Sequence, residues 1–306
     1  MAIRAENDGA LDPGAALAQR ARYHSSADGF NIKRPPVPPH VFTRERDAAF
    51  DAATPTGLLA LDLSRALETP FAATTPLLLA RYARVRAGET LDTRLAASGA
   101  IHYVLTGRGQ TRAGGDTVAW AAGDVFVLPG GPAASHAAAE DSVLWVVTNE
   151  PQLAFERLQP PAPGDAPVQA VHYPAAEIRR QLEAIHRLPA DATMTGKAVT
   201  LSSAALAADR TCLPSLTLAM NSLRPGEAQR AHRHNAVAVT LIVQGTRCHS
   251  RVGDTRIDWQ RHATMITPPG APHSHHNEGA DLALFLIVQD GGLHYHCRTM
   301  GFAYTA

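Results

Sequence analysis

Residues 226–234 read GEAQRAHRH, and residues 268–277 read PPGAPHSHHN. On a β-strand, residues i and i+2 point to the same side, so His232 and His234 would project together into the interior of a barrel. His273 follows a Pro-Pro-Gly turn that brings the chain back, and it is the natural third member of the group. Three neutral imidazoles without a carboxylate leave several positions on a divalent ion open for a chelating substrate and O₂. The pattern predicts a metal site rather than histidines exposed on a polar strand face.

The chain also contains an internal repeat. Residues 85–89 (VRAGE) align with residues 223–227 (LRPGE) at a separation of 138 positions, and a turn glycine and an aspartate stay in register at the same separation. With one residue of slippage, His136 aligns with His275. Matches in order over this length indicate two copies of one structural unit.

Each copy has the pattern of β-structure. Short apolar runs, alternating or continuous, are separated by Gly, Asp and Pro, which is typical of a sandwich or barrel. We expect an all-β protein with minor helices, built from two tandem jelly-roll units. The expected divisions are an N-terminal arm over 1–70, a first unit over 71–150, a linker over 151–210 with a helix from about Pro174 to Ile185, and a second unit over 211–306.

Two motifs of the second copy resemble those of the cupin family. Gly226, five residues and then HRH at 232–234 are similar to the first cupin motif. PPG at 268–270, two residues, His273, three residues and Asn277 are similar to the second. The resemblance implies cupin barrels, and because of the repeat it implies a bicupin.

The expected metal ligands indicate which branch of the cupin family the chain resembles. The acidic residue usual after the first cupin HxH is missing, since residues 235–239 read NAVAV. In this the chain resembles the three-histidine Fe(II) cupins that cleave aromatic rings, the gentisate and salicylate 1,2-dioxygenases. The resemblance implies Fe(II) held by His232, His234 and His273, with a hydroxylated aromatic acid chelated to it and O₂ as the second substrate.

Two features depart from that family. Its iron usually sits in the N-terminal cupin, whereas the matching positions of the first copy here are Arg94, Ala96 and Ala134. We therefore expect the first barrel to be degenerate and free of metal. In addition, Thr240 stands where the family has an arginine that binds the substrate carboxylate.

Other residues are candidates for the substrate side of the site. Arg224 and Arg247, with Arg256 next, are the nearest arginines that could anchor a carboxylate. His275 shares a strand face with the third ligand, and the family has a second histidine there that could donate a hydrogen bond to an oxygen intermediate. Its counterpart His136 lies in the copy without ligands, which favours a structural role for both; the two interpretations stay open.

Two further hypotheses compete with ring cleavage. One is a three-histidine dioxygenase of a non-aromatic chelator such as a diketone or a thiol, and the other is a non-catalytic bicupin that binds a small ligand. A second HxH at 294–296 has no third partner in sequence, so we expect a hydrogen-bonded strand pair there rather than a second metal site.

Composition limits the remaining possibilities. The 28 Lys and Arg balance 28 Asp and Glu, which argues against a nucleic-acid-binding protein. The three cysteines form no CxxC motif, which favours a reducing compartment, and no apolar run approaches a membrane span. The N-terminus does not resemble a secretory signal. We expect a cytoplasmic protein and, from the resemblance, a homo-oligomer, either a dimer or a tetramer.

Overall fold

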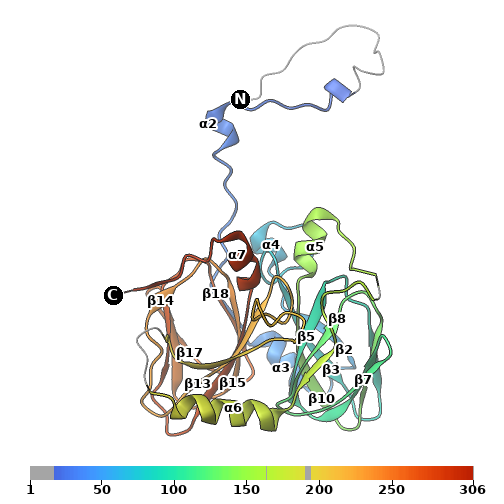
Figure 1. Cartoon of the computed structure of the whole chain (residues 1–306), viewed down its shortest axis with the longest axis vertical. Coiled ribbons are helices and arrows are strands. Elements are labelled where there is room, and N and C mark those ends of the chain that lie inside the picture. Colours follow the sequence, from blue (N-terminus) through green and yellow to red (C-terminus); the bar gives the residue numbers. More distant parts are fainter. Residues whose placement is uncertain (1–16, 163, 190–193, 306) are drawn as a thin grey trace. The chain divides into compact units, whose positions relative to one another are not determined.

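The computed structural model describes residues 17–162, 164–189 and 194–305, and the chain forms two compact units, Met1–Pro35 and Pro36–Ala306. In the first unit, described residues 17–35 contain the short helix α2 (Ser26–Gly29) and are almost entirely exposed. The second unit contains both copies of the repeat, each folded as a β-barrel (Figure 1).

The first barrel consists of a six-stranded sheet in the order β11-β8-β5-β10-β3-β2 and a four-stranded sheet in the order β4-β9-β6-β7. All pairings are antiparallel. The strands are β2 (Gly57–Ala60), β3 (Leu79–Val85), β4 (Thr90–Thr93), β5 (Gly99–Thr106), β6 (Arg108–Ala113), β7 (Asp116–Ala121), β8 (Val125–Pro129), β9 (Ala134–Ala138), β10 (Ser142–Thr148) and β11 (Val171–Tyr173).

The second barrel repeats this design with a six-stranded sheet, β1-β18-β15-β20-β13-β12, and a five-stranded sheet, β17-β16-β19-β14-β21. Its first strand comes from the N-terminal segment. The strands are β1 (His40–Phe42), β12 (Lys197–Leu201), β13 (Thr217–Leu223), β14 (His232–Arg233), β15 (Ala238–Gln244), β16 (Cys248–Val252), β17 (Thr255–Asp258), β18 (Thr264–Thr267), β19 (His273–Asn277), β20 (Ala283–Gln289) and β21 (Ala303–Tyr304).

The two barrels pack through the outer faces of their six-stranded sheets. These strands are covered on both faces, which explains why they read as continuous apolar runs. In β10, for example, Trp145 faces the core between the barrels and Leu144 faces the interior of the first barrel. The Tyr82 hydroxyl donates a hydrogen bond across this core to the main-chain oxygen of His262, at 2.6 Å. This arrangement agrees with the expected all-β fold of two tandem barrels.

Helices are short and lie outside the barrels. They are α3 (Arg44–Phe50), α4 (Ser64–Leu67), α5 (Glu150–Glu156), α6 (Ala175–Arg187) and α7 (Gly291–Cys297). The predicted linker helix is α6, which begins after Pro174 and buries Ile178 and Leu182. In Figure 1 it runs along the lower edge of the second barrel and ends beside the first. In the described part of the chain, no helix has the length and apolar character required to cross a membrane.

The strand pair expected at residues 294–296 is wrong, because these residues lie in α7. The helix begins with two buried glycines, Gly291 and Gly292, and a Cβ on Gly292 would come within 2.4 Å of the Pro214 carbonyl oxygen. Residues two apart on a helix point in different directions, so the two histidines of this HxH do not share a face.

Candidate metal centre

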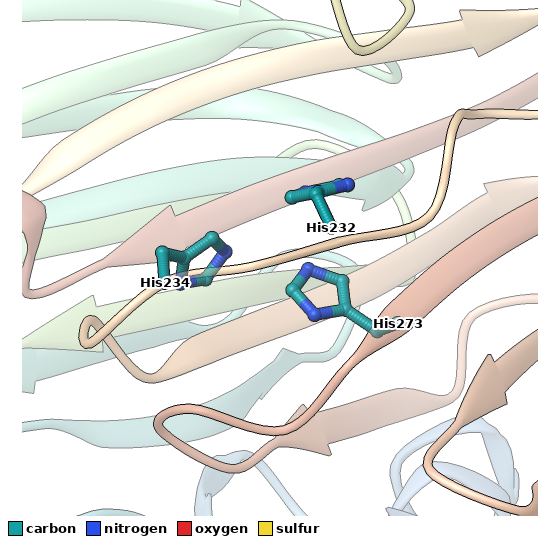
Figure 2. A group of neighbouring side chains, drawn as sticks. All are labelled: His232, His234 and His273. Atoms are coloured by element: carbon teal, nitrogen blue, oxygen red, sulfur yellow. The ribbon is translucent and has the colours of Figure 1, made fainter. Parts of the chain in front are cut away.

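Three histidines converge at one end of the second barrel. His232 in β14 is the direct cross-strand partner of His273 in β19, and His234 follows β14 immediately. One ring nitrogen from each lies within 4.8 Å of the others. Figure 2 shows the three rings turned toward a common point. The structure thus brings together the three residues predicted to be ligands.

Each ring is held in place by its second nitrogen. The Nδ1 atoms of His232, His234 and His273 hydrogen-bond main-chain carbonyl oxygens two residues away, at 2.8, 2.8 and 2.9 Å. A carbonyl oxygen can only accept, so each Nδ1 carries the proton and each Nε2 keeps its lone pair. This is how second partners fix the tautomer of metal-binding histidines. Three Nε2 lone pairs are therefore available at one point.

The protonation states also suit a metal. Burial lowers the pKa of His234 to about 4 and that of His273 to about 3, and it lowers the pKa of His232 as well. All three rings are neutral at pH 7, as ligation requires. In the described residues, this is the one group of His, Cys, Asp and Glu close enough together to hold a metal ion, and it includes no carboxylate. Neutral nitrogen donors suit zinc, copper, iron and nickel.

A cavity of about 270 Å³ opens beside the three rings. Among the described residues, its lining contains no lysine or arginine. The polar groups besides the histidines are threonine hydroxyls, the Tyr295 side chain and three amides, those of Asn221, Gln229 and Gln289. The Gln289 amide nitrogen lies 3.2 Å from His234 Nε2 and donates a hydrogen bond to it, because that Nε2 carries no proton. A bound metal ion would take this lone pair and displace the amide. The cavity is small and neutral apart from a metal ion that would occupy it.

Gln229 is unusual among these residues. Its side chain is only 6% exposed, and its Oε1 atom has no hydrogen-bond partner among the described residues. A buried acceptor without a partner costs about 1–3 kcal/mol, so such a group indicates a missing partner. The main-chain N–H of Gln229 donates to the His275 carbonyl at 2.8 Å, which fixes the residue beside the metal-binding strand. Gln229 lies between the motif glycine and the first ligand, but no pattern in the sequence distinguishes it from its neighbours.

His275 lines the cavity and is almost fully buried. Its Nδ1 atom lies 2.7 Å from the Ser250 hydroxyl oxygen, which also accepts a 2.7 Å hydrogen bond from the Trp259 indole N–H. Another possible acceptor for this hydroxyl, the Met265 sulfur, lies at 3.5 Å and is weaker. Since Ser250 already accepts from the indole, its proton is directed to His275 Nδ1, which leaves the His275 proton on Nε2.

The first barrel contains the same arrangement. His136 Nδ1 lies 2.8 Å from the Thr111 hydroxyl, which accepts a 2.9 Å hydrogen bond from the Trp120 indole. All three residues precede their counterparts in the second barrel by 139 positions. A tryptophan–hydroxyl–histidine group is therefore present in both barrels, including the one in which Ala134 replaces the third ligand.

The arginines predicted as substrate anchors lie outside this cavity. Arg224 follows the end of β13 and lines a separate cavity beside α6. Arg247 is exposed in a turn, and Arg256 pairs with Asp258 and Glu278 at 2.8 and 3.3 Å. The predicted anchoring by Arg224 or Arg247 has no geometric support, because neither lines the metal cavity.

Comparisons with known proteins agree with this geometry. Residues 220–289 match the model of the Cupin domain family. The chain is 33% identical over 82 residues to a gentisate 1,2-dioxygenase of Ralstonia sp., and 25% identical over 250 residues to a 5-aminosalicylate 1,2-dioxygenase of Comamonas sp.. These matches span 27% and 71% of this chain, and 23% and 65% of the two relatives.

Among solved structures, the salicylate 1,2-dioxygenase of Pseudaminobacter salicylatoxidans superposes with a TM-score of 0.75 over 92% of each chain, at 14% identity. A cupin 2 conserved barrel protein of Leptotrichia buccalis covers 84% of the chain with a TM-score of 0.52, at 12% identity. These findings confirm the predicted bicupin fold and the resemblance to gentisate-dioxygenase-like cupins.

Proposed function

We propose that this protein is an Fe(II)-dependent dioxygenase that opens the ring of a hydroxylated aromatic acid, with His232, His234 and His273 as the metal ligands. The observation that carries the proposal is the set of three Nε2 lone pairs within 4.8 Å of one another, without a carboxylate. The similarity to gentisate, 5-aminosalicylate and salicylate 1,2-dioxygenases supports it.

The residues present fit a divalent iron ion. When bound, iron would supply open coordination positions for substrate and O₂ and a path for electrons between them. The neutral ligand set leaves the charge of such an ion uncompensated, so the site favours an anionic chelator with adjacent hydroxyl and carboxylate groups. Burial of the three rings keeps bulk water away from the reacting atoms.

The cavity lining suggests how the substrate would be oriented. With no lysine or arginine present, the carboxylate would have the metal as its main partner. Gln229 Oε1 would accept a hydrogen bond from an O–H or N–H group elsewhere on the ring. A ring hydroxyl or amine satisfies this requirement, and the named relatives act on gentisate and 5-aminosalicylate. We therefore place a hydroxyl- or amino-substituted salicylate first among the candidate substrates.

His275 would act as a hydrogen-bond donor inside the cavity. The Ser250 hydroxyl occupies its Nδ1 atom at 2.7 Å, which leaves the Nε2 proton for a group bound beside the metal. The ring is fully buried and its pKa lies well below the ordinary value because of that burial, so the ring is neutral and carries one proton. Its task would be to orient a bound group.

A second candidate function is oxygenation of a non-aromatic chelator such as a β-diketone or a thiol. The observation that favours it is the absence of a cationic side chain from the cavity lining, since such substrates need no carboxylate anchor. Both functions use the same metal site and differ only in the substrate that the cavity accepts.

Oxygen uptake after anaerobic loading with Fe(II) tests both functions. The panel would contain gentisate, 5-aminosalicylate, salicylate, acetylacetone and cysteamine. We expect stoichiometric uptake with a hydroxyl- or amino-substituted salicylate, loss of uptake in His273→Ala, and full uptake in His296→Ala, whose side chain is exposed on α7. Uptake with acetylacetone or cysteamine alone would favour the second function, and no uptake with any compound would refute both. The homo-oligomeric state stays a prediction, which analytical ultracentrifugation would check.

A further inference from the structure

A second cavity, of about 670 Å³, is lined by residues of both barrels and of α6. Strand β13 separates it from the metal cavity, because alternate residues of a strand face opposite sides. Met220 lines the second cavity, whereas its neighbours Ala219 and Asn221 line the cavity of the three histidines. The two cavities are distinct, and no residue lines both.

The inner wall of this second cavity is apolar. Leu105 comes from the first barrel, Val243 from the second, and Ile178 and Leu182 from α6, and all four are buried. A volume of this size is ordinary for a small-molecule site, and apolar walls with a few polar groups are the usual lining.

The apolar wall contains one buried polar group, the hydroxyl of Tyr103. Tyr103 is 5% exposed and lines the cavity, and its hydroxyl makes no hydrogen bond to any residue that the structure describes. Burial raises the pKa of Tyr103 to about 12 against the opposing charges of Arg261 and Arg179, so the hydroxyl stays protonated and can donate. The nearby Asp124 carboxylate is not its partner: it accepts from the main-chain N–H groups of Ala121 and Ala175 and lies 3.1 Å from His172 Nε2.

The rim of the cavity is positively charged. In the part of the chain that the structure describes, four arginines line it and the single carboxylate of the lining, Glu183, lies 3.6 Å from one of them, Arg187. Arg179 uses one N–H on the Ala175 carbonyl of its own helix, at 3.3 Å, and Arg261 makes no side-chain hydrogen bond within the described residues. The two histidines of the lining have lowered pKa values through burial and are neutral at pH 7.

We infer that this cavity is a binding site for an organic anion, with its carboxylate held by Tyr103, Arg179 and Arg261 and its apolar body packed against the inner wall. Guanidinium groups pair with carboxylates through strong charge-assisted hydrogen bonds, and a protonated phenol adds a third donor. The ligand class is a monocarboxylate with an aromatic or branched aliphatic body. This site is independent of the proposed chemistry at the three histidines.

Calorimetric titration of the full chain with 1-naphthoate tests the inference, with 1-naphthalenemethanol as a neutral compound of the same shape. We expect 1-naphthoate to bind and the alcohol to bind at least tenfold more weakly. Arg261→Gln should weaken 1-naphthoate binding about tenfold, and Tyr103→Phe, which keeps the ring and removes only the hydroxyl, should weaken it several-fold. Arg112→Gln is the matched control, because Arg112 is exposed on β6 outside the cavity.

His273→Ala separates this site from the metal cavity, since it should leave 1-naphthoate binding unchanged. Loss of binding in that variant would place the compound in the metal cavity and overturn the inference. Equal affinity for the alcohol, an unchanged affinity in Arg261→Gln, or no binding of 1-naphthoate at all would overturn it too. None of these results depends on whether the protein consumes oxygen.

Discussion

Removing the central hydroxyl of each tryptophan–hydroxyl–histidine group separates its structural role from its proposed catalytic role. The matched substitutions are Ser250→Ala in the second barrel and Thr111→Val in the first, and both hydroxyl-bearing residues are fully buried. Each substitution leaves an indole N–H and a histidine Nδ1 without a partner. At about 1–3 kcal/mol for each buried unpaired group, either change should lower the free energy of unfolding by about 2–6 kcal/mol. Trp259 is less buried than Trp120, which puts Ser250→Ala nearer the lower limit.

The two substitutions should differ in activity. Ser250→Ala removes the partner that places the His275 proton on Nε2, so kcat/KM for the ring substrate should fall about tenfold to a hundredfold. Thr111→Val acts in the barrel without ligands and should leave kcat/KM unchanged at a temperature where it is folded. Urea unfolding and oxygen uptake on the same preparations give both quantities. If both variants lose stability and both keep full kcat/KM, the role of His275 in the metal cavity is refuted.

Three further predictions concern the metal, the substrate and pH. His273→Ala should lower Fe(II) affinity at least a hundredfold while His296→Ala leaves it unchanged, as measured by metal titration under anaerobic conditions; equal affinities would exclude His273 as a ligand. Gln229→Leu should raise KM about tenfold for a hydroxyl- or amino-substituted salicylate and leave KM for salicylate unchanged, because only the former has a donor for Oε1; equal effects would contradict the assignment. Burial lowers the pKa of His262 to about 4 in the folded protein, against about 6.5 in the unfolded chain. Between these two values the unfolded chain binds the proton more tightly, so the free energy of unfolding should fall as pH drops from 6.5 toward 4, by up to about 1.4 kcal/mol per pH unit. His262→Asn, which tolerates the positive φ of 64° at this position, should flatten the pH dependence of urea unfolding, and an unchanged slope would contradict the lowered pKa.

Local sequence periodicity was sufficient to predict the convergence of the three histidines. His232 and His234 are two apart on extended chain, and the Pro-Pro-Gly turn brings His273 back as the cross-strand partner of His232. Both relations depend on strand geometry within a short stretch, which is what alternation and turn residues specify. The fold class followed for the same reason, because each copy of the repeat has the same succession of strands and turns.

Contacts between distant segments account for the predictions that the structure did not support. Arg224 lies two residues before the motif glycine, but it follows the end of β13 and belongs to the cavity beside α6. Residues 294–296 lie in a helix whose second residue, Gly292, packs closely against the Pro214 carbonyl, a partner 78 positions away in the chain. Gln229 lies beside the metal-binding strand through its main-chain bond to the His275 carbonyl, a residue 46 positions away. None of these contacts leaves a periodic signal in the sequence.

The two barrels together show which parts of the site belong to the scaffold. The tryptophan–hydroxyl–histidine group occurs in both, and in the first barrel His136 completes it with a second bond from Nε2 to the Thr93 hydroxyl at 3.2 Å. His275 has no such bond to a described residue, and it faces the metal cavity instead. The histidine Nδ1 is therefore held in the same way in both barrels. The Nε2 atom differs: it bonds the Thr93 hydroxyl in the first barrel and faces the metal cavity in the second. A structural histidine of the barrel becomes available to a bound group only where the neighbouring strand positions carry imidazoles.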